Sequence, residues 1–520
     1  MAYLATNEDF DLLRNRVKTI YARIELLDKD MNVIDQLEGI TMEGSVSIDA
    51  DSDIRRTFSS KIYLDKSSAI AKYEESELIN KYLHVYIGLR SSLVTKWYSL
   101  GLFAFAENGY MFSQEENSLS VSCVDLTAKL NDTLAGQLTG LQTKITEGSS
   151  IRNAILSTVA LGGFTKCMVD YWNRTVPYDL EYDTGVSVWE ILTELRDLYY
   201  PFEMYFDEDT FVCKQIPDGY EDPVVLQDDV LRDFVIEEQS NVDYSQVRNC
   251  VEVFGASASA DYYCDNVSYA NGQYTLRVDG ASVTSSKKFS FLAPVDNPAN
   301  CTVLIISTID GQEQRAGPYT MYYGVDVDTG NDRTLQSGVM KAGKYYVVKH
   351  DVKQKKFYYV GQQQTHAMVM LMDHVPGSAA LEQMKKDENC DNLKVIGTQD
   401  VSETDDLYKS RFSIDRIGRR NLVLSGGDYE NYTTDEGCME VAQYEHWKRC
   451  RLTDTLTLKT AMIPWLDVNQ KVSYRANYLN MKEAVQWIVK NITIELSEGT
   501  MSVTMARYYP YYPFIVQNKY

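Results

Sequence analysis

The sequence lacks any long apolar run. Its longest uninterrupted apolar stretches, such as Ala367–Met372 and Val303–Ile306, are far shorter than the ~18 residues that a membrane-spanning helix needs. The first nine residues, Met1–Asp9, carry acids where a secretion signal carries bases. We therefore expect no membrane span, and a chain that is made and assembled in the host cytoplasm.

Paired cysteines are also lacking. The nine cysteines are scattered, odd in number and without a CxxC pair, which favours reduced thiols used as small apolar side chains. Disulfides and zinc sites are not expected. The cysteines are Cys123, Cys167, Cys213, Cys250, Cys264, Cys301, Cys390, Cys438 and Cys450.

Basic residues are too few for a nucleic-acid-binding surface. The chain has 51 Lys and Arg against 74 Asp and Glu, a net charge of −23, and the acids are spread along it. Its densest basic stretches, Lys353–Lys356 and Arg416–Arg420, are too short to release many counterions from DNA. Stable nucleic-acid binding is not expected, although an acidic wall suits a channel that DNA must cross without sticking.

Catalytic motifs are absent as well. The sequence has no GxSxG and no HExxH, and its five histidines do not pair at ligand spacing. A pair of glycosidase carboxylates can form from distant residues, so the sequence leaves that alternative open. With no motif in its favour, we expect a non-enzymatic protein without catalytic residues. The histidines are His84, His350, His366, His374 and His446.

Two loops resemble ligand sites only in part. Gly338–Lys344 follows the start of a phosphate-binding loop, but Tyr345 replaces the magnesium-binding hydroxyl and a strand-like run follows. Asp326, Asp328 and Asp332 have the early spacing of a calcium loop, but neither its Gly nor its closing Glu is present. Both segments are interpreted as turns, so no cofactor and no metal ion is expected.

Alternation of apolar and polar residues predicts a mainly β (α+β) chain. With 44% hydrophobic and 24% charged residues it has a globular composition, and its length predicts about three or four domains. Period-2 runs up to about residue 130 predict a small antiparallel barrel or sandwich. Two helices and a pair of short strands then predict a compact α/β domain. The predicted domains are 1–135 (β-barrel), 136–222 (α/β), 223–255 with 410–520 (second β-barrel) and 256–409 (inserted, β-rich).

Three local signals are clearest. Ser187-Val-Trp-Glu190 is a capping box that opens a helix, and an amphipathic helix begins at Thr434. Ile492–Met505 alternates on both sides of a Ser-Glu-Gly-Thr turn, which predicts a hairpin. The outgoing strand of this hairpin, Thr500–Met505, resembles Ser118–Cys123. One matching strand at each end suggests a duplicated β domain.

Tyrosine is abundant, with 38 residues against 16 Phe and 6 Trp, and its half-polar ring suits protein interfaces. Strand cores and subunit contacts explain clustered tyrosines more often than sugar stacking does. The candidates for contact with a glycan or another protein are Tyr319, Tyr322, Tyr323, Tyr358 and Tyr359.

Several stretches, over roughly 1–255 and 410–513, resemble the tail hub (baseplate hub or tail-tip) proteins of phages that infect Gram-positive bacteria. They are Gly44-Ser-Val-Ser-Ile-Asp-Ala-Asp-Ser-Asp-Ile-Arg-Arg-Thr57, Val124-Asp-Leu-Thr-Ala-Lys-Leu130, Val176-Pro-Tyr-Asp-Leu180, Trp189-Glu-Ile-Leu-Thr-Glu-Leu-Arg-Asp-Leu-Tyr199, Glu203-Met-Tyr-Phe-Asp207, Ile463-Pro-Trp-Leu-Asp-Val468 and Gly499-Thr-Met-Ser-Val-Thr-Met-Ala-Arg-Tyr-Tyr-Pro510.

The resemblance implies two tube-like antiparallel β-barrel domains side by side, and a homotrimer whose ring adapts the tail tube to the tip and lets DNA through. It implies a structural virion protein at the tail tip. The expected partners are further copies of the chain, the tail tube or distal tail protein, the tape measure protein, and tip or fibre proteins. Two alternatives remain open: a receptor (glycan) binding protein, and a cell-wall hydrolase with a carboxylate pair or a Cys and His pair in one pocket.

Overall fold

The structure is a computed structural model, and it divides the chain into two compact units. One unit combines Met1–Ser245 with Leu452–Tyr520, and the other is Gln246–Arg451. With 49% of the chain in strands and 18% in helices, the mainly β fold expected from the alternation is confirmed. The structure describes residues 5–15, 19–40, 43–64, 70, 75–90, 95–112, 117–140, 143–171, 173–176, 179–198, 202–217, 222–325, 331–400, 412–451, 454–477 and 483–508.

The first unit begins with an antiparallel half-sheet in the order β3-β4-β7-β6-β5-β1-β2. Alternating residues face its core: in β4, for example, Phe58 and Ile62 are buried while Thr57 and Ser59 are exposed. The elements are α1 (Asn7–Arg14), β1 (Thr19–Leu27), β2 (Val33–Ile40), β3 (Glu43–Asp49), β4 (Arg56–Tyr63), η2 (Glu75–Asn80), β5 (Tyr82–Arg90), β6 (Thr95–Phe112), β7 (Asn117–Val124) and η3 (Leu126–Lys129).

A second antiparallel half-sheet, in the order β14-β28-β31-β30, comes mostly from the C-terminal part of the chain. The predicted Ile492–Met505 hairpin is confirmed as β30 and β31. The elements are β13 (Val224–Leu226), α4 (Asp228–Leu231), η4 (Arg232–Phe234), β14 (Val235–Val242), β28 (Asp454–Ala461), β29 (Lys471–Tyr474), β30 (Val485–Glu495) and β31 (Thr500–Arg507).

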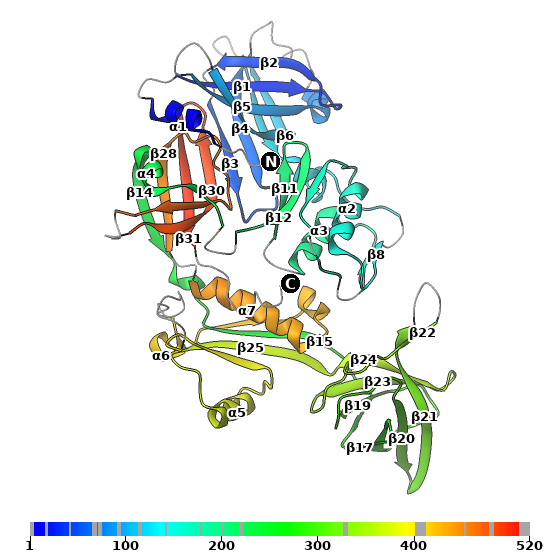
Figure 1. The fold of residues 1–520 in the computed structure, drawn as a ribbon. Coiled ribbons are helices and arrows are strands. Elements are labelled where there is room, and N and C mark those ends of the chain that lie inside the picture. The colour runs from blue at the N-terminus through cyan, green and yellow to red at the C-terminus, as the bar shows by residue number, and fades with distance from the viewer. Residues whose placement is uncertain are drawn as a thin grey trace. The chain divides into compact units, whose positions relative to one another are not determined.

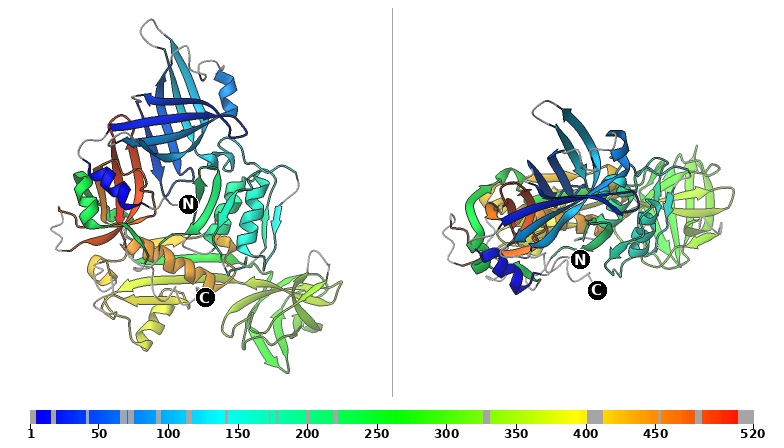
Figure 2. Two further views of the ribbon diagram at one scale, coloured as in Figure 1. Left: turned by 45° about the horizontal axis from the view of Figure 1, so that its top comes forward. Right: turned by 90° about the horizontal axis from the view of Figure 1, so that it is seen from above.

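The two half-sheets form one sheet, because β3 pairs antiparallel with β30. Val46 lies opposite Ile494 and Ile48 opposite Ile492, and all four side chains are buried in a core shared by both halves. Figure 1 shows blue β3 beside red β30, and the turned view of Figure 2 agrees. The sequence suggested two barrels side by side, whereas the structure has two half-sheets that this strand pair joins into one continuous sheet.

The halves also repeat one strand order. The order β3-β4-β7-β6 in the first half matches β14-β28-β31-β30 in the second, with every neighbouring pair antiparallel. The two strands whose sequences resemble each other, β7 and β31, occupy the same position in this order. The structure therefore supports the duplication that the sequence suggested.

An α/β segment lies between the halves in sequence. Ser187 opens its second helix as predicted, because its Oγ accepts a hydrogen bond from the Glu190 amide at 3.1 Å. Leu192 and Leu195 on this helix are buried in a second core. The elements are β8 (Thr143–Ile145), α2 (Ile151–Leu161), β9 (Cys167–Val169), β10 (Leu180–Tyr182), α3 (Val188–Asp197), β11 (Phe202–Asp207) and β12 (Thr210–Gln215).

The unit Gln246–Arg451 contains two sheets. One has four strands in the order β26-β25-β15-β27, and α7 packs on β15 and β25. The other has nine strands around its own core. The elements of the first sheet are β15 (Cys250–Ser257), β25 (Gln364–Met372), α5 (Ser378–Asp387), β26 (Leu393–Gly397), α6 (Ile414–Ile417), β27 (Asn421–Leu424), η6 (Gly427–Asn431) and α7 (Asp435–Arg451), and η5 (Tyr244–Gln246) lies at the unit boundary.

The nine-stranded sheet follows the path β16-β19-β23-β24-β21-β20-β18-β17, with β22 pairing with β21 beside the path. Its strands fall within the predicted inserted segment 256–409. They are β16 (Tyr262–Cys264), β17 (Asn266–Ala270), β18 (Gln273–Asp279), β19 (Lys288–Leu292), β20 (Thr302–Ile309), β21 (Gln312–Val325), β22 (Asp332–Thr334), β23 (Tyr345–Asp351) and β24 (Lys356–Gln362).

The unit boundaries differ from those expected at 255/256 and 409/410. The sequence placed β15, β27 and α7 with the second barrel, but all three lie in the unit Gln246–Arg451. The physical reason is pairing: β15 lies between β25 and β27, so it completes their sheet. The predicted helix from Thr434 is confirmed as α7, and it packs on that sheet.

The β3–β30 joint yields a stability prediction. Ile492→Ala removes a fully buried side chain opposite Ile48, so we expect the first unit to lose about 2–5 kcal/mol of unfolding free energy in urea titrations. Thr493→Ala, on the other face of the same strand, is the control and should cost less than about 1 kcal/mol. Equal costs for the two variants would contradict the buried joint.

Candidate functional site

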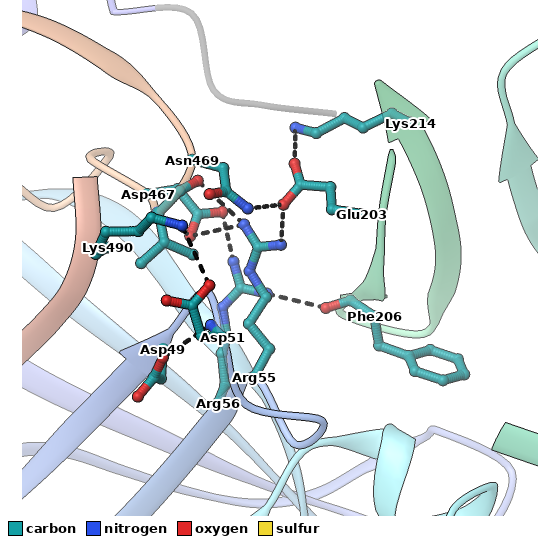
Figure 3. A network of polar contacts seen from close by, with 11 residues as sticks. Asp49, Asp51, Arg55, Arg56, Glu203, Phe206, Lys214, Asp467, Asn469 and Lys490 are labelled. Atoms are coloured by element: carbon teal, nitrogen blue, oxygen red, sulfur yellow. Dashed lines mark hydrogen bonds and ion pairs between the residues drawn. The ribbon is translucent and has the colours of Figure 1, made fainter. Parts of the chain in front are cut away.

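A network of charged side chains lies where three parts of the first unit meet (Figure 3). Arg55 comes from the β3–β4 turn and Arg56 from the start of β4. The α/β segment contributes Glu203, and the loop between β28 and β29 contributes Asp467 and Asn469. These residues are far apart in sequence. They define the junction cluster: Arg55, Arg56, Glu203, Asp467 and Asn469.

Arg55 is the centre of the junction cluster. Its side chain is only 4% exposed. Its Nη1 donates to Glu203 Oε2 at 2.6 Å and its Nη2 to the Val468 carbonyl at 3.1 Å. Its guanidinium also lies over the Tyr205 ring, 3.8 Å from the ring centre. One side chain thus connects the β3–β4 turn with both other segments.

Arg56 makes a second set of bonds across the same junction. Its Nη2 donates to Asp467 Oδ2 at 2.7 Å and its Nη1 to the Phe206 carbonyl at 2.9 Å. Its backbone amide donates to buried Asp125 at 2.7 Å, and Asp125 also caps η3 by accepting from the Thr127 amide. Arg56 therefore bonds to the α/β segment at Phe206, to the β28–β29 loop at Asp467 and to Asp125, which caps η3.

Glu203 is almost fully buried, with 6% of its side chain exposed. Besides Arg55, its Oε2 accepts from Asn469 Nδ2 at 2.7 Å, and its Oε1 lies 3.4 Å from Lys214 Nζ. A buried carboxylate without such partners would be costly to keep charged. The charges in the cluster therefore compensate one another.

The electrostatics of the cluster stabilise its charged form. Burial alone would raise the pKa of Asp467, but Arg56 and Arg55 outweigh it and lower that pKa to about 2. The pKa of Arg55 is raised, because Asp467 and Glu203 outweigh the burial that would lower it. Removing one partner of such a buried pair typically costs 3–5 kcal/mol, since the other charge is left uncompensated.

The cluster continues to the β3–β30 joint through its more exposed rim. Lys490 Nζ donates to Asp51 Oδ1 at 3.1 Å, and the Ala50 amide donates to the Lys490 carbonyl at 2.9 Å. Asp49, at the end of β3, lies opposite Asn491 of β30. The turn at which the strand joint ends therefore leads directly into both arginines of the cluster, Arg55 at its end and Arg56 at the start of β4.

This geometry fits a mechanical connection better than acid–base catalysis. A general acid needs a carboxyl group whose pKa is raised, whereas two arginines lower the pKa of Asp467. Glu203 is bonded to Arg55 and Asn469 and has little access to solvent. Glu203 and Asp467, the two acids of the cluster, are thus each bonded to an arginine.

Sequence reasoning did not single out the cluster as a site, but a signal was present. Arg55 and Arg56 lie in the quoted stretch Gly44–Thr57, Glu203 in Glu203–Asp207 and Asp467 in Ile463–Val468. Asp125, which binds the Arg56 amide, lies in Val124–Leu130. Four of the stretches that carry the tail hub resemblance therefore meet at one junction.

The five candidate tyrosines lie around β21 and β24 but on different faces. Tyr323 stacks on Tyr359 at 5.7 Å between ring centres, and both pack against the core of the nine-stranded sheet, as does Tyr319. Tyr322 lies opposite Tyr358 on the neighbouring strand, with ring centres 6.3 Å apart. Because side chains alternate along strands, these two face away from that core.

Polar groups surround the outward pair. Tyr358 Oη lies within hydrogen-bond distance of Asp332 Oδ1 (2.9 Å) and of Gln354 Oε1 (2.8 Å), and Lys356 Nζ lies 5.3 Å from the centre of the Tyr322 ring. Two aromatic rings with neighbouring polar groups are a chemistry that sugars and protein surfaces both recognise. The structure thus separates two outward candidates from three core-facing ones.

The partial ligand motifs end differently. Gly338–Lys344 forms turns that lead into strand β23, as interpreted from sequence. Asp332 binds Tyr358 and Lys356, whereas Asp326 and Asp328 lie outside the described residues. In the described ranges no group of three or more His, Cys, Asp or Glu is arranged to hold a metal ion.

Among the described helices, none is long and apolar enough to cross a membrane.

The cysteines are free thiols, and all except half-buried Cys167 are buried, as expected of small apolar side chains. One of them meets a histidine: Cys450 Sγ lies 3.3 Å from His446 Nε2 on α7. Both side chains are 1% exposed or less, and Cys450 Sγ donates to the Arg248 carbonyl. A hydrolase needs such a pair at a surface that substrate can reach.

Comparison with known proteins gives one family match. A family model described as a domain of unknown function (DUF5048) matches residues 409–512. The matched segment includes α7 and β28 to β31. A search of curated proteins finds no match to the chain.

Among solved structures, this chain is similar over nearly its whole length to three tail proteins, two of them from prophages. A tail protein from Neisseria meningitidis MC58 aligns over 94% of this chain and 96% of its own, with TM-score 0.47 and 9% identity. The 43 kDa tail protein of prophage MuSo2 from Shewanella oneidensis aligns over 94% and 98%, with TM-score 0.45 and 11% identity. Prophage tail protein gp18 from Listeria monocytogenes EGD-e aligns over 93% and 94%, with TM-score 0.40 and 8% identity.

All three structures are named as tail proteins. The Gram-positive host range stays a prediction.

The junction cluster predicts an acid-sensitive part of the stability. The pKa of Asp467 is about 2 in the folded chain and about 3.9 in an unfolded one. The ionised carboxylate therefore stabilises the fold above pH ~4, and this contribution is lost as the pH falls through about 2. Between pH ~5 and ~2, the protein should lose up to about 2 kcal/mol more unfolding free energy than Asp467→Asn does in urea titrations.

Asp51→Asn is the matched control, because Asp51 is 74% exposed at the rim of the same network. Its pH profile should follow that of the unchanged protein. Parallel profiles for Asp467→Asn and the unchanged protein would contradict the electrostatic role assigned to Asp467.

Proposed function

We propose that the chain is a structural subunit of a phage tail tip, a tail hub whose ring of three copies joins the tail tube to the tip and lets DNA pass. The observation that carries this proposal is the repeated strand order within one continuous sheet. A chain that contains the same β-module twice allows three copies to present six modules. Such a ring matches a six-fold tube above it and a three-fold tip below it.

The charge supports the same role. A net charge of −23 opposes stable binding of DNA, whereas a conduit must release the DNA that passes through it. The proposed function is structural and not enzymatic. The proposed location is the virion tail tip after assembly in the host cytoplasm.

The proposed partners follow from this position. They are further copies of the chain within the ring, the tail tube or distal tail protein and the tape measure protein on the tube side, and tip or fibre proteins on the other. The junction cluster suits a subunit under mechanical load, because buried charge pairs join the α/β segment to the sheet.

A measurement of mass tests the ring. Light scattering on the purified full-length chain should give three times the mass of one chain, and the protein should be found in isolated tail tips. A chain that stays monomeric at every concentration and is absent from tail tips would contradict the proposal.

A second candidate function is glycan contact at Tyr322 and Tyr358, favoured by their outward position and polar neighbours. The full chain should then bind specific glycans on an array. Tyr322→Ala and Tyr358→Ala should weaken that binding by about tenfold, the effect of losing ~1.4 kcal/mol of ring contact. Tyr345→Ala, at a 52% exposed tyrosine of β23, is the control. Absence of glycan binding, or an equal loss in the control, would exclude this candidate.

A further inference from the structure

The two halves of the large sheet correspond residue by residue, beyond their strand order. The ladder of β6 with β7 has a bulge between Phe105 and Glu107, and the ladder of β30 with β31 has one between Val489 and Asn491. When residues are counted from these bulges, each residue pair of the β6–β7 ladder corresponds to one pair of the β30–β31 ladder. The same backbone hydrogen bond follows β4 and β28: Leu64 N to Asn117 O, and Met462 N to Gly499 O.

This correspondence shows how one half joins the other. The first part of β30, Val485–Ile488, pairs with β29, and its last part, Asn491–Glu495, pairs with β3. The equivalent strand β6 pairs with β5 over Thr95–Ala104 in the same manner. Its last part, Glu107–Phe112, pairs with β7 on one side. In the ranges that the structure covers, no strand pairs with its other side, although η2 contacts β6.

The other half has a complementary edge. Strand β14 is the equivalent of β3, because each pairs with the corresponding strand of its half, β28 or β4. β3 also pairs with β30, whereas among the described strands only β28 pairs with β14. The chain thus carries one copy of the joint in use, between β3 and β30, and the two strand edges of a second joint.

The chemistry of both edges suits coverage by protein. Met111 and Phe112 at the end of β6 are 53% and 83% exposed, and Ile236 on β14 is 56% exposed. Neither β14 nor Glu107–Phe112 contains Lys or Pro, two of the residues that commonly protect free strand edges, although Glu237 and Glu238 of β14 and Glu107 of β6 are acidic. Exposed apolar side chains at a strand edge are typical of a surface that other protein covers.

A buried polar group points in the same direction. The Nδ2 atom of Asn108 is buried and has no hydrogen-bond partner among the described residues. Asn108 is the equivalent of Ile492, which lies opposite Ile48 across the existing joint. A strand added at this edge in the register of the existing joint would place Val242 opposite Asn108, and the half-buried Ser240 diagonally across from it, two residues along the strand.

We propose that β14 of one copy of the chain pairs antiparallel with Glu107–Phe112 of β6 in a second copy, with Ser240 opposite Tyr110. This register transfers the observed Val46–Ile494 pair of the β3–β30 joint onto the equivalent residues of the two edges. It also places Gln239 opposite Met111 and Asn241 opposite Gly109. The inference rests on the proposed ring, for which it names the contact between subunits.

The contact is head-to-tail, because the two copies use different edges. Each copy offers one β14 edge and one β6 edge, so the same joint repeats around a ring until it closes. In a closed ring of three copies, joints within and between chains alternate. The sheet would then continue through six modules without a free edge of this kind.

Engineered disulfides test the register. In Met111→Cys/Gln239→Cys the two thiols face each other across the proposed joint, at the Cα separation that a disulfide requires. Both positions are exposed, so the changes should not disturb the fold. With half-buried Cys167 replaced by serine in every variant, mild oxidation should give covalent dimers and trimers that reducing agent abolishes.

Gly109→Cys/Glu237→Cys is the matched control. It uses the same two strands and also two exposed positions, but Glu237 lies four residues, roughly 13 Å, from the predicted partner of Gly109. It should give no covalent species. A trimer by light scattering in which the first pair fails to crosslink, or both pairs crosslink equally, overturns this inference and leaves the ring standing. A chain that is only monomeric overturns both.

Discussion

The antiparallel pairing of β3 with β30 is the interaction on which the rest of the large sheet depends. It joins strands more than 400 residues apart, buries Val46 and Ile48 against Ile494 and Ile492, and makes one core of two half-sheets. The turn after β3 and the first residue of β4 then supply the two arginines of the junction cluster, Arg55 and Arg56. The position of the α/β segment therefore follows from the strand joint.

The strand joint and the junction cluster stabilise the first unit in different ways. Hydrophobic burial along β3 and β30 stabilises the joint without a preferred direction, whereas the charged groups are directional, because each guanidinium bonds only where acceptors match its planar fork. Arg55 meets Glu203 and Val468, and Arg56 meets Asp467 and Phe206. A shift of the α/β segment would leave buried charges without partners.

The sequence predicted local structure better than it predicted long-range partners. The Ser187 cap, α7 and the β30–β31 hairpin follow from short patterns. The match of Thr500–Met505 with Ser118–Cys123 correctly identified β31 and β7 as equivalent strands of the two halves. The assignment of β15 and α7 to the second barrel differed from the structure, because alternation shows that a strand exists but not which strand it joins. Arg55, Glu203 and Asp467 lay in the stretches that resembled tail hubs, but no spacing rule could bring them together. The sequence could not show that Tyr358 faces outward and Tyr359 faces the core, because this depends on how β24 pairs within its sheet.

Electron cryo-microscopy of the assembled tail tip tests the central claim most directly. The account predicts a ring of three chains in which six four-stranded modules follow one another with near six-fold symmetry, joined alternately by β3–β30 within a chain and by β14–β6 between chains. A ring with another number of chains, or one in which neighbouring chains meet away from the β14 and β6 edges, would contradict it.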